Sequence, residues 1–360
     1  MTRQHRRFSP TRLFGALLAL TLIVASPAPA QERESFRIAW SIYVGWMPWS
    51  YGDQEGIVQK WADKYDIDIE LVQINDYIES INLYTAGSFD GVTVTNMDAL
   101  AIPAAGGVDT TALIVGDFSN GNDGIVLKGS SDLAAIEGRR VHLVELSVSH
   151  YLLARGLESV GLRERDLRVV NTADADLVAA FASRDVQAAV AWNPQLNEIR
   201  RQPGANVVFD SSQIPGEIMD LLVVNSETLQ AHPELGKALA GAWYEIMGVM
   251  SGDDTAGERA REHMAEAAGT DLAGFQTQLD STHMFYSASE AADFAASDQP
   301  RTTMERVRRF AFENGLFGER ARSADFVGIE FADGSVLGSE QNVRLRFTDR
   351  YMRMAADGEL

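Results

Sequence analysis

From residue 35 onward, short apolar runs alternate with amphipathic stretches, and this alternation limits the fold more than any other feature of the chain. Strand-like runs lie at 36–40, 67–74 and 90–95, and the stretches between them, 56–65 and 77–87, have the apolar spacing of helices. Alternation of this kind is typical of βαβ units in a mostly parallel sheet. We therefore predict an α/β fold in which the loops at the carboxyl ends of the strands hold the ligand.

A second strand–helix series begins at 123–129 and ends with the strand-like run 219–225, and residues 230–317 have a mainly helical pattern. Two series in one chain predict two lobes with a cleft between them. The chain has no low-complexity linker, so we expect strands that cross a hinge to connect the lobes. We predict lobe 1 at 36–124 and 220–325, lobe 2 at 125–219, and a C-terminal extension at 326–360 that packs on lobe 1.

The first 30 residues, 1–30, have the pattern of a secretory signal peptide. Four Arg precede the apolar run 13–25, and the small-residue site Ala28-Pro29-Ala30 follows it. This pattern predicts cleavage before Gln31 and export of the remaining chain. The apolar run is shorter than the roughly 20 residues that a membrane-spanning helix needs, so we expect no membrane insertion.

The composition argues against several functions. The chain has 31 basic and 51 acidic residues, a net charge of -20, and loss of the four N-terminal Arg makes this about −24. Such a surface repels nucleic acid and anionic membranes, so we predict no nucleic-acid partner. The chain has no Cys, which excludes disulfides, thiol catalysis, thiolate metal sites and lipid attachment at an N-terminal Cys.

The loop after the first strand-like run, "WSIYVGWMPWSY", holds half of the six Trp of the chain. Within it, Tyr43, Trp46 and Trp49 recur at every third position. An aromatic wall beside a cleft stacks on a planar solute or attracts a cation, and each desolvated contact contributes about 0.5 to 2 kcal/mol. The alternative is that some of these rings only pack between the loop and its lobe.

Five further loops follow strand-like runs and supply the other candidate ligand contacts. The candidates are Asn96 with Asp98, Asp117, Glu145 with Ser147 and His150, Trp192 with Asn193, and Glu217 with Asp220. Helix N-capping is the alternative role of Asp98. None of the five loops holds Lys or Arg. Because oxyanion sites normally use Arg or Lys donors, the loops favour a solute that donates hydrogen bonds and carries positive charge.

Three stretches resemble the nitrate/sulfonate/taurine class of substrate-binding proteins of ABC transporters. They are "GIVLKGSSDLAAIEGRRVHLVELSVSHYLLARGL", "AVAWNPQL" and "LLVVNSETLQAHPEL". Within that class, "YVGWMPW" and "IVGDFSNGNDGIVLKG" are similar to the branch found beside urea carboxylases. Asn193 stands where the class commonly has an acidic residue, which leaves its role open.

This resemblance implies a two-lobed periplasmic binding fold of type II and a free periplasmic protein that works with an ABC permease and, through it, an ATPase. It also implies a small nitrogen-rich solute, urea or guanidinium, and does not decide between them. The residues favour guanidinium, because a carboxylate kept in an aromatic cleft is costly without a cationic partner. Urea is planar too, but it is neutral and requires no buried carboxylate.

Other functions stay open as alternatives. One is a binding protein for another amine or for a thiamine-precursor-like solute. Another is an enzyme on the same fold, with Ser149, His150 and Asp117 as a triad, but the chain lacks the G-x-S-x-G elbow that such chemistry often uses. The six His have no close pairing, so we predict neither a metal site nor a cofactor. We expect a monomer.

Overall fold

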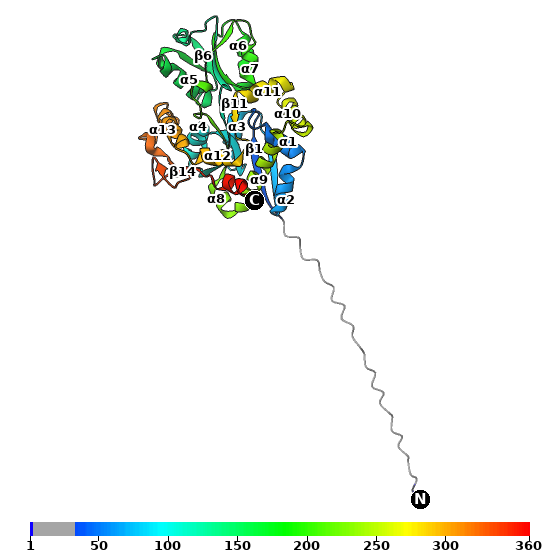
Figure 1. The fold of residues 1–360 in the computed structure, drawn as a ribbon. Helices are drawn as coiled ribbons and strands as arrows, with labels where there is room; N and C mark the ends of the chain where they lie inside the picture. The colour runs from blue at the N-terminus through cyan, green and yellow to red at the C-terminus, as the bar shows by residue number, and fades with distance from the viewer. Residues whose placement is uncertain (3–32) are drawn as a thin grey trace. The chain divides into compact units, whose positions relative to one another are not determined.

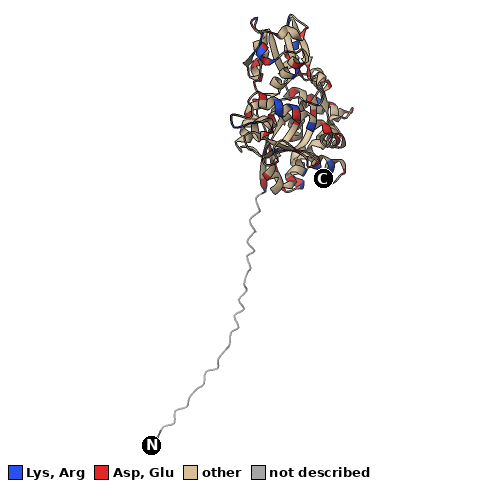
Figure 2. Ribbon diagram, turned by 90° about the vertical axis from the view of Figure 1, so that its left-hand side faces the viewer, with Lys and Arg blue, Asp and Glu red and all other residues tan. Residues whose placement is uncertain are grey.

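The computed structural model describes residues 1–2 and 33–360, and residues 34–360 form one compact unit (Figure 1). Apart from its first two residues, the predicted signal peptide lies outside the described residues. Among the residues that are described, no helix has the length and apolar content that crossing a membrane requires. Acidic and basic side chains are interspersed over this unit (Figure 2).

The first of two sheets has the strand order β13-β12-β14-β4-β10-β3-β1-β2, and β11 pairs with β4. β1 runs parallel to both β2 and β3, whereas β10 is antiparallel to its neighbours β3 and β4. The strands are β1 (Glu34–Trp40), β2 (Ile67–Gln73), β3 (Gly91–Thr95), β4 (Thr110–Ser119), β10 (Met219–Asn225), β11 (Thr282–Met284), β12 (Gly328–Glu330), β13 (Val336–Leu337) and β14 (Val343–Phe347).

Helices flank this sheet, and small residues let them pack closely. A Cβ atom added to Gly241 would lie 2.3 Å from the Trp61 ring, so glycine allows α2 and α9 to approach each other. The helices of this part are α1 (Met47–Gln54), α2 (Ile57–Lys64), α3 (Tyr77–Thr85), α4 (Asn96–Ala99), α8 (Ser226–Ala231), α9 (Pro233–Met250), α10 (Thr255–Ala267), α11 (Leu272–Asp280), α12 (Ala288–Ala295), α13 (Asp298–Glu313) and α14 (Arg350–Ala356). We call the first sheet with these helices the first lobe.

The second sheet has the order β7-β6-β8-β5-β9. Its central strand β8, "AAVAW", is buried along its whole length, as expected of a strand covered on both faces. The elements are β5 (Asp123–Lys128), β6 (Arg140–Leu143), β7 (Arg168–Asn171), β8 (Ala188–Trp192), β9 (Ala205–Asp210), α5 (Val148–Ser159), α6 (Asp174–Ala182) and α7 (Gln195–Arg200). We call this sheet with its helices the second lobe.

The chain crosses between the two sheets twice, at 120–122 and at 211–218. The two crossings are tied together by hydroxyl groups. Ser119 Oγ lies 2.5 Å from Asp123 Oδ2 and 2.6 Å from Ser211 Oγ, and the Gly121 N–H donates to Ser211 Oγ at 2.7 Å. The lobes are therefore joined by two short segments that are hydrogen-bonded to each other, and not by a flexible tether.

The tail 326–360 adds strands to the first sheet. β14 pairs in parallel with β4, and β12 pairs in parallel with β14. α14 packs against α9 and α12. A Cβ atom added to Gly236 in α9 would lie 2.4 Å from the Tyr351 ring of α14, so the tail is fitted to the first lobe.

Candidate functional site

A small cavity with a volume of about 20 Å³ lies between the two lobes. Both sheets contribute to its walls, together with the loop after β1 and the amino ends of α3 and α5. It is lined by Ser41, Ile42, Tyr43, Trp46, Tyr77, Thr95, Asp123, Val148, Trp192, Ile218 and Asp220.

Pairing between strands brings polar residues of the site together in each of the two sheets. In the first sheet, Thr95, Asp220 and Asp117 are direct neighbours across β3, β10 and β4. In the second sheet, Asp123 is the direct neighbour of Trp192. Opposite residues on paired strands hold their side chains close together, so residues far apart in sequence meet at the ends of the two sheets.

Four aromatic rings form a continuous wall. Ring centroids are 4.9 Å apart for Tyr43 and Trp46, 5.6 Å for Trp46 and Tyr77, and 5.7 Å for Tyr77 and Trp192. The first three belong to the first lobe and Trp192 belongs to the second. Such a wall offers faces for stacking to a planar solute and for attraction of a cation.

Four carboxyl groups are buried in or beside this cavity: Asp98, Asp117, Asp123 and Asp220. The Tyr43 hydroxyl donates to Asp117 Oδ1 at 3.3 Å. Gly45 makes room for Asp117, because a Cβ atom at Gly45 would lie 2.1 Å from its Oδ2. Each of the four carboxyl groups has one oxygen without a hydrogen-bond partner among the described residues.

Burial and mutual proximity shift these acids strongly. Desolvation, with the charge of Asp123 adding to it, raises the pKa of Asp117 to about 7, although contacts with Asp220 and Tyr43 lower it. Desolvation also raises the pKa of Asp123 to about 7, and the pKa of Asp220 is raised well above its usual range by burial and by Asp117. The cluster thus holds protons at neutral pH unless a positive charge compensates it.

No Lys or Arg side chain is among the described residues that line the cavity. Nor do the described His, Asp and Glu side chains form a group arranged to hold a metal ion. Among the described lining residues, the ionisable acids are Asp123 and Asp220, and they lie beside aromatic faces.

The structure brings six of the predicted site residues together. Tyr43, Trp46, Trp192 and Asp220 line the cavity, and Asp98 and Asp117 are bonded to its lining residues Tyr77 and Tyr43. Trp49 lies deeper, where it packs on Trp243 with ring centroids 5.0 Å apart.

The other predicted residues mainly support the backbone around the site. The Asn96 amide donates to the Glu217 carbonyl at 3.2 Å and accepts from the Met219 N–H at 3.0 Å. Ser147 caps α5 by accepting the Ser149 N–H. The Asn193 amide donates to Ser281 Oγ at 3.3 Å.

Glu145 and His150 do not line the cavity. Glu145 is exposed, and its backbone N–H donates to Asn171. His150 Nε2 lies 2.8 Å from Glu164 Oε2, and its Nδ1 accepts the Leu146 N–H. These bonds turn the His150 ring away from a ligand role in the cavity.

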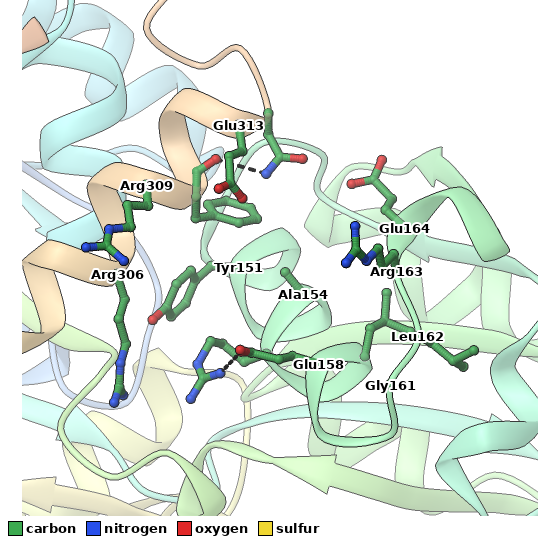
Figure 3. A pocket seen from close by; sticks show the side chains of 14 residues that line it. Tyr151, Ala154, Glu158, Gly161, Leu162, Arg163, Glu164, Arg306, Arg309 and Glu313 are labelled. Atoms are coloured by element: carbon green, nitrogen blue, oxygen red, sulfur yellow. Dashed lines mark hydrogen bonds and ion pairs between the residues drawn. The ribbon is translucent and has the colours of Figure 1, made fainter. Parts of the chain in front are cut away.

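Glu217 belongs to a different cluster, which joins residues of both lobes outside the cavity lining. Its Oε2 accepts from the Tyr151 hydroxyl at 2.6 Å and from Arg155 Nε at 2.8 Å, and Arg306 pairs with its Oε1. Tyr151 and Arg155 lie on α5, whereas Arg306 lies on α13, at a groove between these helices (Figure 3). Hydrogen bonds and charge from Arg155 outweigh desolvation and lower the pKa of Glu217.

Comparison with known proteins places the chain in a family. Residues 59–245 match the family model described as NMT1/THI5 like, which is more than half of the chain. The chain belongs to this family.

Relatives of this NMT1/THI5-like chain include the taurine-binding periplasmic protein of Escherichia coli, which is 27% identical over 131 residues, or 36% of this chain and 40% of that protein. A putative binding protein of Brucella abortus is 24% identical over 180 residues, or 49% of this chain and 56% of that protein. The chain thus spans about half the length of these curated relatives.

Among solved structures, the aliphatic sulphonate binding protein SsuA of Escherichia coli has a TM-score of 0.65 at 18% identity, over 81% of this chain and 96% of that one. This likeness confirms the predicted two-lobed α/β binding-protein fold. The names of these relatives agree with the resemblance to the sulfonate/taurine class, and the urea/guanidine branch stays a prediction.

Sequence reasoning missed two important residues of this NMT1/THI5-like site, Tyr77 and Asp123. Tyr77 starts α3 after β2, and Asp123 starts the strand that crosses into the second lobe. Both follow turn-rich stretches, Tyr77 after a predicted strand and Asp123 at the predicted hinge. Their positions at these places were the one sequence signal that could have identified them as site residues. Ser41, Ile42, Thr95, Val148 and Ile218 complete the lining and carry no motif of their own.

The Glu217 cluster predicts a stability effect separate from binding. Glu217→Gln should lower the free energy of unfolding by about 1 to 3 kcal/mol, because two Arg and a buried hydroxyl lose a charged acceptor. Thermal unfolding in buffer without guanidinium salts measures this. Glu158→Gln, which removes an exposed partner of the same Arg155, should change stability by less than about 0.5 kcal/mol. Equal effects of the two variants would contradict the assignment.

Proposed function

We propose that this protein is the periplasmic solute-binding component of an ABC importer and captures guanidinium in the cavity between its lobes. The observation that carries this proposal is the set of four buried carboxyl groups in or beside an aromatic cavity with no basic lining residue among those described. Hinge closure at the two crossings would exclude water from the ligand and present a closed surface to a permease.

Guanidinium matches each feature of the cavity. Its planar N–H groups fork onto carboxylates such as Asp123 and Asp220, and its faces stack on rings such as Trp46. Its positive charge offsets the desolvation of the acids, which is costly when they are ionised alone. The small size of the cavity also favours a solute of few atoms.

Urea is the second candidate, and one observation favours it. The Trp46 indole N–H is buried and has no acceptor among the described residues, and a urea carbonyl would accept from it. Guanidinium has no acceptor. Urea nevertheless supplies no charge for the carboxyl groups, so we rank it second.

A sulfonate or nitrate ligand fits less well, because oxyanions need cationic donors and would meet four acids here. A larger amine or a thiamine precursor would need a larger cavity. A solute with few N–H groups would leave the buried carboxyl groups without hydrogen-bond donors. A hydrolase triad finds little support, since His150 is bonded to Glu164 and the Leu146 backbone. Export to the periplasm, a monomeric state and coupling to a permease and ATPase belong to this proposal.

Isothermal titration calorimetry on the chain without residues 1–30 tests the ligand directly. We expect guanidinium to bind more tightly than urea, and taurine to give no measurable heat. Sodium chloride at the same ionic strength controls for salt effects. Tighter binding of urea than of guanidinium would overturn the ranking, and binding of taurine alone would overturn the proposed solute class.

The pKa values predict a pH dependence for the guanidinium complex. Near pH 6, Asp117 and Asp123 are mainly protonated because their pKa is about 7, so a cation must displace protons. Affinity should therefore rise with pH between about pH 6 and pH 8, by up to about tenfold per pH unit for each displaced proton. Titrations in buffers with different ionisation enthalpies count the protons released. Affinity for urea should change little, and a pH-independent guanidinium affinity would contradict the role of these acids.

Substitution of Trp46 and of Trp49 should distinguish a ring that contacts the ligand from a ring that only packs in the interior. Trp46→Ala should weaken guanidinium binding by about 1 to 2 kcal/mol, because a ring of the cavity wall is lost. Trp49→Ala should instead lower the free energy of unfolding by about 3 to 5 kcal/mol through loss of buried packing. Calorimetric titration and thermal unfolding of both variants measure the two effects. A larger loss of affinity in Trp49→Ala would reverse the assignment of the two rings.

A further inference from the structure

Asp98 lies at the boundary between the lobes although it belongs to the first one. It is the third residue of α4, which directly follows β3, and its side chain is fully buried. α4 packs against α5 of the second lobe. A carboxyl group from one lobe thus lies beside the start of a helix in the other.

The hydrogen-bond partners of Asp98 belong to the first lobe, whereas its helix α4 contacts the second lobe. From the first lobe, the Tyr77 hydroxyl donates to Asp98 Oδ2 at 2.7 Å and Thr95 Oγ1 donates to it at 2.9 Å. On the side of the second lobe, α5 contacts α4, and Val148, the first residue of α5, lines the cavity, while Asp98 Oδ1 has no hydrogen-bond partner among the described residues. Burial raises the pKa of Asp98 to about 6, and Tyr77, Thr95 and the Val148 N–H each act to lower it.

Val148 is the first residue of the twelve-residue helix α5. The amino end of a helix carries unpaired N–H groups and partial positive charge, so it attracts anions. Near this end, Ser147 Oγ is engaged with the Ser149 N–H, and Ser149 Oγ is buried without a partner among the described residues. In a protein with a cavity at this place, the helix end would favour a bound oxyanion, but Asp98 already supplies a negative charge there.

We propose that Asp98 is a built-in counter-charge for the amino end of α5 and makes the cavity select cations against oxyanions. An oxyanion at the helix end would face a fixed carboxylate, whereas a cation in the cavity gains one more acidic neighbour. This inference rests on the proposed cation site and names the residue that decides the sign of the ligand charge.

Asp98→Asn tests the proposal, because it removes the charge and keeps an oxygen for Tyr77 and Thr95. The probes are guanidinium chloride and sodium methanesulfonate, a small monovalent sulfonate, titrated by calorimetry at about pH 8. We expect the wild-type protein to give no heat with methanesulfonate. Asp98→Asn should bind methanesulfonate at least about tenfold more tightly than the wild type and guanidinium at least about tenfold more weakly.

Asp117→Asn is the matched control, since it makes the same chemical change on β4. It should weaken guanidinium binding without any gain for methanesulfonate. If Asp98→Asn does not fold, Asp98→Ser keeps a small polar group on α4 and carries the same expectation. No gain for methanesulfonate in either Asp98 variant, or an equal gain in Asp117→Asn, would overturn the role of Asp98. Failure of the wild type to bind guanidinium would instead overturn the proposed solute, and the methanesulfonate comparison would still test the charge at α5.

Discussion

The structure around the cavity depends on one electrostatic constraint, the burial of several carboxyl groups where the chain crosses between two sheets. Strand pairing places Asp220 beside Asp117, and Asp123 begins the strand that enters the second lobe. Like charges at such distances in a desolvated site cannot all be ionised without compensation. The free protein holds protons there, and a bound cation would replace them. If the proposed cation binds, its charge and the protonation of these acids are therefore parts of one equilibrium.

The aromatic wall sets the shape of the site and the carboxyl groups set its charge. Tyr43 and Tyr77 link the two functions, because each ring belongs to the wall and each hydroxyl donates to an acid, Asp117 or Asp98. These bonds fix the direction of the acids before any solute enters. A preformed site loses less conformational freedom on binding than one that must be ordered by its ligand.

The sequence predicted the two-lobed α/β fold and the aromatic loop, because strand–helix alternation and clustered Trp are local signals. It could not distinguish Trp46, which lines the cavity, from Trp49, which packs in the interior, because the two residues lie only three positions apart in the same turn. Glu217 and Asp220 looked equivalent, yet one pairs with Arg155 and the other lines the cavity. The arginine partners of Glu217 come from α5 and α13. They are so far from Glu217 in the sequence that no local pattern could predict the pairing. Asp123 was missed because its role depends on the crossing geometry.

Sulfonate binders and this chain share a fold, so if the proposed cation is the ligand, the fold alone does not determine the sign of the ligand charge. The amino end of α5 offers positive potential in any protein with this helix at the cavity. What differs is the source of the negative charge that meets it. In the proposed arrangement, Asp98 supplies that charge from a short helix of the opposite lobe, and the rest of the cavity stays acidic. On that proposal, a single carboxylate at the helix end would convert an anion-binding arrangement into a cation-binding one without a change in topology.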